Sequence, residues 1–81
     1  MSINVQYFAR YRETLGLDSE QVEGEFASID ALRLHLLKRD GAWQVLAEQN
    51  LMCARNQEMC QLGEPLQAGD EVAFFPTVTG G

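Results

Sequence analysis

The sequence has few basic residues, and this scarcity argues against several classes of partner. Among 81 residues there are six Lys and Arg against twelve Asp and Glu, which leaves a formal net charge of −6. Nucleic-acid binding depends on clustered Lys and Arg that neutralise phosphates. We therefore expect no nucleic-acid partner and no anionic membrane partner. The acidic balance favours protein partners that present basic surfaces.

Side chains that bind metals or carry out catalysis are also scarce. His35 is the only histidine, and Cys53 and Cys60 are the only cysteines. Metal sites usually combine three or four ligands at short spacings, and this cysteine pair fits none of the zinc patterns. Two cysteines are too few for a disulfide framework. We expect no bound metal or cofactor, reduced thiols and a cytoplasmic location.

Long hydrophobic runs are missing as well. The longest apolar stretches are far shorter than the ~20 residues of a membrane-spanning helix, and residues 1–4 lack the features of a signal peptide. Apolar residues nevertheless make up 46% of the chain, which is typical of a globular protein. A chain of this length is expected to form one small domain with a thin core.

Hydrophobic alternation predicts five strands. Residues 3–8 alternate as in a half-buried strand. Residues 19–26 are acidic, with Val22 as their only interior hydrophobe, and predict an exposed edge strand. The remaining predicted strands are residues 51–55, 58–61 and 72–75.

The helical pattern is strongest after Ser28, a good N-cap residue. Ile29, Leu32 and Leu36 fall on one face of the expected helix, and Gly41 is its expected stop. Short helices are also expected over residues 9–15 and 42–49. The order of elements predicts an α+β fold: a mixed sheet with the main helix on one face, and the first and last strands adjacent and parallel.

A two-residue hairpin is predicted at Asn56 and Gln57, because Asn tolerates positive φ. In that register Cys53 lies directly opposite Cys60. Both are expected to be small strand hydrophobes, although the register also permits a cross-strand disulfide.

The end of the chain is the unusual feature of this sequence. After a strand that should be central come Thr77, Val78, Thr79, Gly80 and Gly81. Five extended residues reach at most ~17 Å, and two glycines can thread a channel that any side chain would block. We expect residues 1–76 to form the domain and residues 77–81 a flexible tail. A frayed end without function is the alternative.

These terminal residues carry a resemblance to a known family. The stretch GDEVAFFPTVTGG closely resembles the end of molybdopterin synthase small subunits, which are ubiquitin-like sulfur carriers with the β-grasp fold. Other parts of the chain fit the same family: residues 5–9, 12–13, 56–57 and 65–66. The resemblance implies a β-grasp sheet of about five strands, one main helix and short extra helices. One departure is Thr77, where the family often has a second proline, and this implies a less rigid start of the tail.

The resemblance also implies a reaction cycle at Gly81. A carboxylate is a poor electrophile at neutral pH, so a ubiquitin-activating-type adenylyltransferase would use ATP to convert it to an acyl-adenylate. A sulfur donor such as a cysteine desulfurase system would then form the thiocarboxylate. The large synthase subunit, which binds the pterin precursor, would receive residues 77–81 and take the sulfur for the molybdopterin dithiolene. The chain would be a non-catalytic subunit of a heterotetramer of two small and two large subunits.

The partner-binding surface can be predicted from strand parity. If Val72 and Phe74 face the core, Phe75 faces outward, and parallel pairing brings Phe8 to the same end of the sheet. Exposed aromatics clustered there are typical of an interaction surface, although one of them could instead cap the core. The predicted partner-binding residues are Phe8, Phe75 and the adjacent Pro76. Arg12 lies nearby and is added because it could pair with an acidic group of a partner; a solvated surface arginine is the alternative.

Other functions remain open at this point. The chain could be a ubiquitin-like modifier joined to target lysines through Gly81, or a sulfur carrier of another pathway such as thiamin synthesis. It could also be an interaction module with an inert tail.

Overall fold

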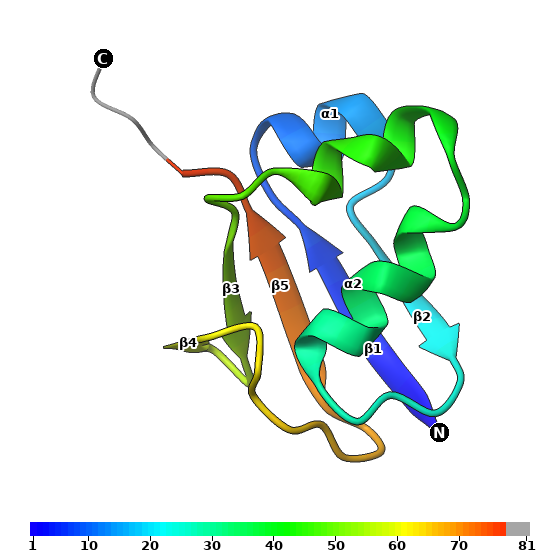
Figure 1. The fold of residues 1–81 in the computed structure, drawn as a ribbon, viewed down its shortest axis with the longest axis vertical. Coiled ribbons are helices and arrows are strands. Elements are labelled where there is room, and N and C mark those ends of the chain that lie inside the picture. The colour runs from blue at the N-terminus through cyan, green and yellow to red at the C-terminus, as the bar shows by residue number, and fades with distance from the viewer. Residues whose placement is uncertain (78–81) are drawn as a thin grey trace.

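A five-stranded mixed sheet with helices on one face makes up the fold (Figure 1). The computed structural model describes residues 1–77. In chain order the elements are β1 (Ser2–Tyr7), α1 (Arg10–Leu15), β2 (Ser19–Glu23), α2 (Ile29–Leu37), the 3-10 helix η1 (Gly41–Ala47), β3 (Met52–Arg55), β4 (Glu58–Cys60) and β5 (Glu71–Phe75). None of the helices in this part of the chain is long and apolar enough to cross a membrane.

The strand order is β2-β1-β5-β3-β4, with β1 and β5 parallel at the centre. The other neighbouring strands are antiparallel. This confirms the predicted mixed sheet, the adjacent first and last strands, and the edge position of the acidic strand β2.

Alternating side chains of the central strands form the core. Val5 and Tyr7 of β1 and Val72 and Phe74 of β5 are almost fully buried, on the face that the helices cover. Leu32 of α2 belongs to the same buried cluster. Burial of such a side chain contributes ~1.5–3 kcal/mol, so these contacts fix the position of β5, the last element before the chain end.

Helix α2 begins as predicted, because the Ser28 hydroxyl accepts a hydrogen bond from the amide of Ala31 at 3.2 Å. The predicted stop at Gly41 is wrong. The helix ends at Leu37, and Gly41 is the first residue of η1. Gly41 has a φ of +59°, so its left-handed backbone turns the chain into the next element instead of capping the previous one.

Two other predicted elements differ in extent. The predicted helix over residues 42–49 is the 3-10 helix η1, and its Leu46 is fully buried. The predicted strand over residues 19–26 ends at Glu23. Phe26 has left the sheet and lies in the core with 5% of its surface exposed. Core burial of Phe26 therefore ends the edge strand earlier than its charge pattern indicated.

The β3–β4 hairpin agrees with the prediction. Asn56 and Gln57 form its two-residue turn, with φ of +50° and +72°. The register pairs Cys53 with Cys60. Two hydrogen bonds connect this turn to the start of β5. The backbone N–H of Asn56 donates to the carbonyl of Glu71 at 2.8 Å, and the N–H of Glu71 donates to the Asn56 side-chain oxygen at 2.9 Å.

Candidate docking face beside the end of β5

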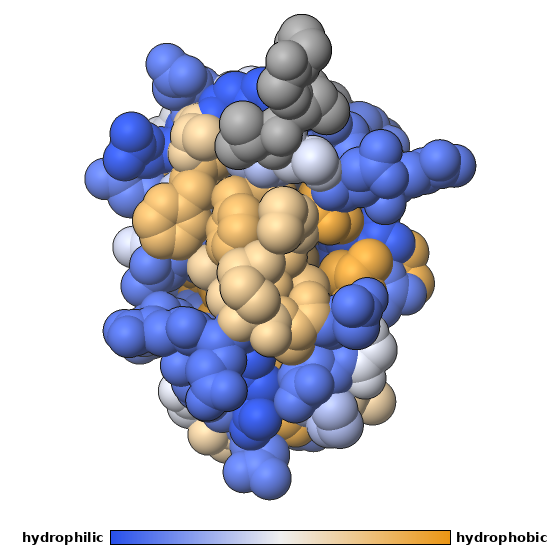
Figure 2. All heavy atoms as spheres, turned by 90° about the vertical axis from the view of Figure 1, so that its left-hand side faces the viewer, coloured by the Kyte–Doolittle hydropathy of each residue, from blue (hydrophilic) through white to orange (hydrophobic). Residues whose placement is uncertain are grey.

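The side of the sheet that the helices leave uncovered carries a cluster of apolar side chains. We call this cluster the apolar face; its members are Phe8, Met52, Ala54, Met59, Ala73 and Phe75. Figure 2 views the molecule from the side of β3 and β4 and shows apolar side chains gathered in one patch, with hydrophilic side chains around it. Phe8, Met52 and Met59 are exposed, whereas Ala54 and Ala73 keep only 7% and 8% of their surface exposed. Exposed apolar side chains gathered in this way mark interaction sites.

Pairing of neighbouring strands assembles the apolar face. Met52 of β3 lies opposite Phe75 of β5, and Ala54 lies opposite both Ala73 of β5 and Met59 of β4. Residues directly opposite each other point to the same side of a sheet. These five strand positions are therefore outward-facing, whereas Cys53 and Phe74 between them face the core.

Phe8 and Phe75 meet at one end of this face, as predicted. Their ring centroids are 6.0 Å apart with an interplanar angle of 83°, an edge-to-face contact. The Phe8 amide donates a hydrogen bond of 3.1 Å to the carbonyl of Phe74, so the pairing of β1 with β5 continues to this residue. Phe8 is 42% exposed even so, and its ring is accessible to a partner.

A shallow pocket of about 370 Å³ lies on the apolar face. Phe8, Ala73, Phe75 and Met59 contribute its apolar lining. Polar side chains complete its rim: Gln6, Gln57 and Glu71. An apolar centre with a polar rim is the usual anatomy of a protein–protein interface.

The chain leaves the sheet beside this face. Pro76 is buried and Thr77 is half-buried, and the Thr77 hydroxyl donates a hydrogen bond to the carbonyl of Asn50. Because Pro76 is buried, it is the least accessible of the four predicted partner-binding residues. The other predicted site residues of the tail, which are Val78, Thr79, Gly80 and Gly81, lie outside the described residues.

Arg12, the fourth predicted partner-binding residue, lies on α1. Its Nε is 3.7 Å from Asp18 Oδ1, and the two side chains are 55% and 82% exposed. A pair this long and this exposed contributes little to stability, so the Arg12 guanidinium is available to an acidic group of a partner. Among residues 1–77, the Arg12 side chain makes no second ion pair and no side-chain hydrogen bond.

The sequence interpretation missed the contributions of Met52, Ala54 and Met59 to the apolar face. Alternation within β3 and β4 could have placed them on one side of a hairpin. It could not have placed that hairpin beside β5, because β3 and β5 are separated in sequence and pair only in the folded chain.

Within residues 1–77, no group of three or more His, Cys, Asp and Glu is arranged to hold a metal ion. His35 packs against the ring of Phe26, with centroids 5.1 Å apart. Glu20 of the acidic edge strand β2 accepts a 2.8 Å hydrogen bond from the Tyr7 hydroxyl, so its carboxylate contributes to the contacts within the fold.

Comparison with known proteins places this arrangement in a family. The sequence profile of the ThiS family matches residues 5–81, which is nearly the whole chain. The chain belongs to the ThiS family.

Two relatives are similar over almost their entire length. The molybdopterin synthase sulfur carrier subunits of Haemophilus influenzae and Escherichia coli are each 42% identical to this chain over 80 residues. Each alignment covers 98% of this chain and 99% of the relative. These matches confirm the resemblance that the sequence motifs indicated.

A solved structure of a ubiquitin-like protein confirms the fold. The crystal structure of small archaeal modifier protein 1 (SAMP1) from Haloferax volcanii superimposes with a TM-score of 0.83 and 28% sequence identity, over 100% of both chains. The five-stranded mixed sheet with its packed helix is therefore the β-grasp fold that was predicted for this ThiS-family chain.

Proposed function

We propose that this protein is the sulfur carrier subunit of a molybdopterin synthase and that it carries sulfur on Gly81. The observation that carries the proposal is the 42% identity to two proteins of that name, over 98% of this chain. That both relatives bear this name favours the molybdopterin pathway over thiamin synthesis. The chain itself binds no cofactor in this scheme, and it acts in the cytoplasm.

The chemistry takes place at the main-chain carboxylate of Gly81. An adenylyltransferase of the ubiquitin-activating type lets this carboxylate attack the α-phosphate of ATP, and pyrophosphate leaves. A sulfide equivalent from a donor system then displaces AMP and gives the thiocarboxylate. In the large subunit the thiocarboxylate sulfur bonds to a carbon of the bound pterin precursor and displaces an oxygen substituent there. Water then cleaves the acyl–sulfur bond, which restores the carboxylate and leaves the sulfur on the pterin. Two such transfers supply the two dithiolene sulfurs.

The apolar face is the docking surface in this proposal. It lies where β5 ends, so a partner bound there is close to the point at which residues 77–81 begin. The partner contributes an apolar patch with a basic rim, because this chain carries a net charge of −6 and charge complementarity guides encounter and orientation. Phe8 and Phe75 are the expected anchors, since aromatic residues often dominate interface energetics.

Intact-mass measurement tests the proposal directly. Incubation with the adenylyltransferase, ATP and a sulfur donor is expected to raise the mass by about 16 Da, because sulfur replaces one oxygen. The control is a variant without Gly80 and Gly81, which is expected to keep its mass. If the full-length chain shows no ATP-dependent increase, the carrier function is wrong.

The variant Gly81→Ala provides a second, finer control. An added methyl group obstructs a narrow channel, and displacement of a reacting group by about 1 Å can reduce a rate ~100-fold. We expect sulfur transfer to fall at least ~10-fold while the melting temperature stays unchanged. A large loss of thermal stability would show that Gly81 is packed in the fold and that the tail picture is wrong.

A second candidate function is conjugation to other proteins through Gly81. The structural likeness to small archaeal modifier protein 1, at 28% identity, favours it. The same incubation distinguishes the two functions when a cell extract is added. A modifier forms covalent species larger than 9.1 kDa that resist reducing agents, whereas a carrier forms the thiocarboxylate of the free chain. An interaction module with an inert tail forms neither.

A further inference from the structure

Cys53 and Cys60 have no part in the proposed function, yet the fold places them together. They are directly paired across β3 and β4. The Cys53 thiol donates a hydrogen bond of 3.4 Å to the carbonyl oxygen of Cys60. Both side chains point to the core-facing side of the hairpin, since Ala54 and Met59 between them form part of the apolar face. Both thiols are free in this structure.

The spacing of paired strand residues suits a disulfide. Directly opposite residues of an antiparallel pair have Cα atoms about 4.5 or 5.5 Å apart. Disulfides form at Cα separations of about 4.4–6.8 Å. Either type of strand pair lies inside this range, so a bond between Cys53 and Cys60 requires side-chain rotation and no separation of the strands.

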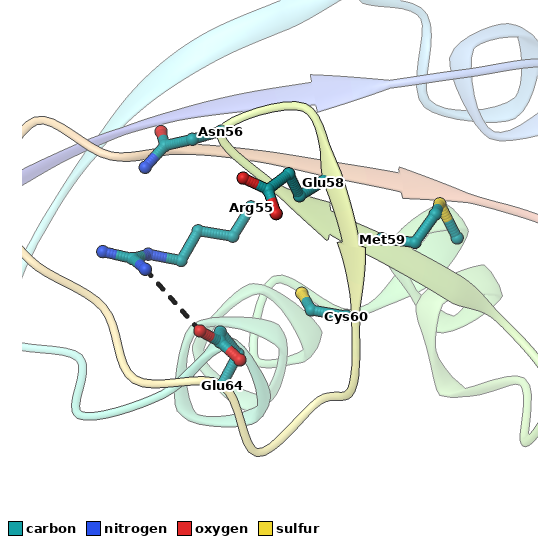
Figure 3. A pocket seen from close by; sticks show the side chains of 6 residues that line it. All are labelled: Arg55, Asn56, Glu58, Met59, Cys60 and Glu64. Atoms are coloured by element: carbon teal, nitrogen blue, oxygen red, sulfur yellow. Dashed lines mark ion pairs between the residues drawn. The ribbon is translucent and has the colours of Figure 1, made fainter.

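The two thiols differ in accessibility. Cys53 is buried, whereas Cys60 is half-buried at the sheet edge. Cys60 lines a surface pocket of about 180 Å³ together with Arg55 and Glu64. Figure 3 shows the Cys60 and Met59 side chains on opposite sides of β4, with Cys60 on the side of Glu64; both residues belong to the lining of this pocket. A reagent in solution therefore reaches Cys60 first.

The environment of Cys53 lowers its reactivity toward reagents in solution. Burial, with a smaller contribution from Cys60, raises the pKa of the Cys53 thiol to about 12. Because the thiolate is the nucleophile, Cys53 reacts slowly with a reagent in solution. Its partner sulfur, however, is held one strand spacing away, and proximity compensates for low thiolate content.

We propose that Cys53 and Cys60 form a redox site at which a low-molecular-weight disulfide, such as oxidised glutathione, closes a reversible cross-strand disulfide. The Cys60 thiolate attacks one sulfur of the reagent and releases one thiol. Cys53 then attacks the Cys60 sulfur of this mixed disulfide, loses its proton and releases the second thiol. The two protein thiols are oxidised by two electrons, and the reagent is reduced to two thiols.

The bond would clamp the edge of the sheet. Strand β4 has only three residues and pairs with β3 alone. Its outward residue Met59 is 55% exposed and belongs to the apolar face. Closing the disulfide would fix the position of Met59 on that face, and reduction would release it.

The test needs neither the adenylyltransferase nor the tail, so it is independent of the proposed function. The folded, full-length protein is incubated with oxidised glutathione, alkylated and weighed intact. We expect a loss of about 2 Da with no alkylation, because two hydrogens leave. Peptide mapping without reductant is expected to join Cys53 to Cys60, and dithiothreitol is expected to reverse the change.

Two variants assign the order of attack. Cys53→Val, a replacement of similar size for a core strand position, is expected to stop at the glutathione adduct on Cys60, a gain of about 305 Da. Cys60→Ala is expected to stay largely unmodified. Cys53→Ala replaces Cys53→Val if the latter does not fold. A stable glutathione adduct on the wild-type protein, or a disulfide-linked dimer in place of the loss of 2 Da, would overturn the proposal.

Discussion

At the scale of single residues, the Asp70 carboxylate holds the connection between β4 and β5 to the β3–β4 hairpin. It accepts hydrogen bonds from Arg55 Nε at 2.7 Å, Asn56 Nδ2 at 3.1 Å and the Gln67 amide at 2.8 Å. Asp70 is 7% exposed, so few of its interactions are exchanged with water. The hydrogen bond from Arg55, followed by the bonds from Gln67 and Asn56, lowers the pKa of the Asp70 carboxyl below its usual value.

Asp70→Asn is expected to lower the free energy of unfolding by ~1–3 kcal/mol, because the donors on Arg55, Asn56 and Gln67 lose their charged acceptor. A carboxyl whose pKa is lowered by folding stabilises the native state above its unfolded pKa of ~3.9, and this contribution disappears as the pH falls through the folded pKa. Chemical denaturation at pH 7 and at decreasing pH measures both effects.

The control is Glu13→Gln, which also removes one negative charge but from an exposed residue of α1. It is expected to leave stability at pH 7 and the acid transition almost unchanged. Equal losses in both variants would indicate an effect of net charge, and the hydrogen-bond account of Asp70 would be wrong.

At the scale of elements, the β3–β4 hairpin is turned by two residues in left-handed conformations. Asn56 suits this conformation, but Gln57 has a φ of +72°, where a long side chain is strained and glycine is not. Asn-Gly is the preferred pair for such a turn. The sequence therefore predicted the position of the turn correctly through Asn56 alone.

Gln57→Gly is expected to raise the free energy of unfolding by ~0.5–1 kcal/mol, because relief of the positive φ outweighs the added freedom of the unfolded chain. Thermal or denaturant unfolding measures the change. Gln61→Gly, the same substitution after β4 at a residue without positive φ, is expected to bring no gain. A loss of stability in Gln57→Gly would show that the Gln57 side chain contributes more than the turn strain costs.

At the scale of the whole molecule, one side of the sheet is packed against the helices and the other is open to solvent. The helix-covered side contains the core, and the opposite side carries the apolar face and lies beside the end of β5 (Figure 1). Exposed apolar residues are not confined to that face, since Leu34 on α2 is 50% exposed. Substitutions of Phe8 on the apolar face and of Leu34 on α2 can therefore distinguish a specific docking surface from a general effect of exposed apolar side chains.

Phe8→Ser is expected to weaken binding to the proposed partner, the large synthase subunit, at least ~10-fold, which corresponds to ~1.4 kcal/mol, because an aromatic anchor is lost. Leu34→Ser, a matched loss of exposed apolar surface on the helix-covered side, is expected to bind normally. Isothermal titration calorimetry measures both affinities, and circular dichroism checks that both variants are folded. Equal weakening in the two variants would exclude a specific role for the apolar face.

The sequence by itself determined the features that depend on local patterns. Alternating hydrophobes predicted β1 and β5, Ser28 predicted the start of α2, and Asn56 predicted the hairpin with its Cys53–Cys60 register. These predictions succeeded because propensity, capping and turn geometry act between residues that are close in the chain. The Gly-Gly motif and its sequence context likewise indicated the family.

Tertiary structure decided the features that depend on distant residues. The pairing of β3 with β5 placed Met52 beside Phe75 and completed the apolar face. Folding brought Arg39 to Glu20 at 2.7 Å, so one acid of the edge strand is engaged within the chain and is not simply solvated. Such contacts join residues that are far apart in sequence. Which residues meet depends on which strands become neighbours in the sheet, and local sequence patterns do not determine the strand order.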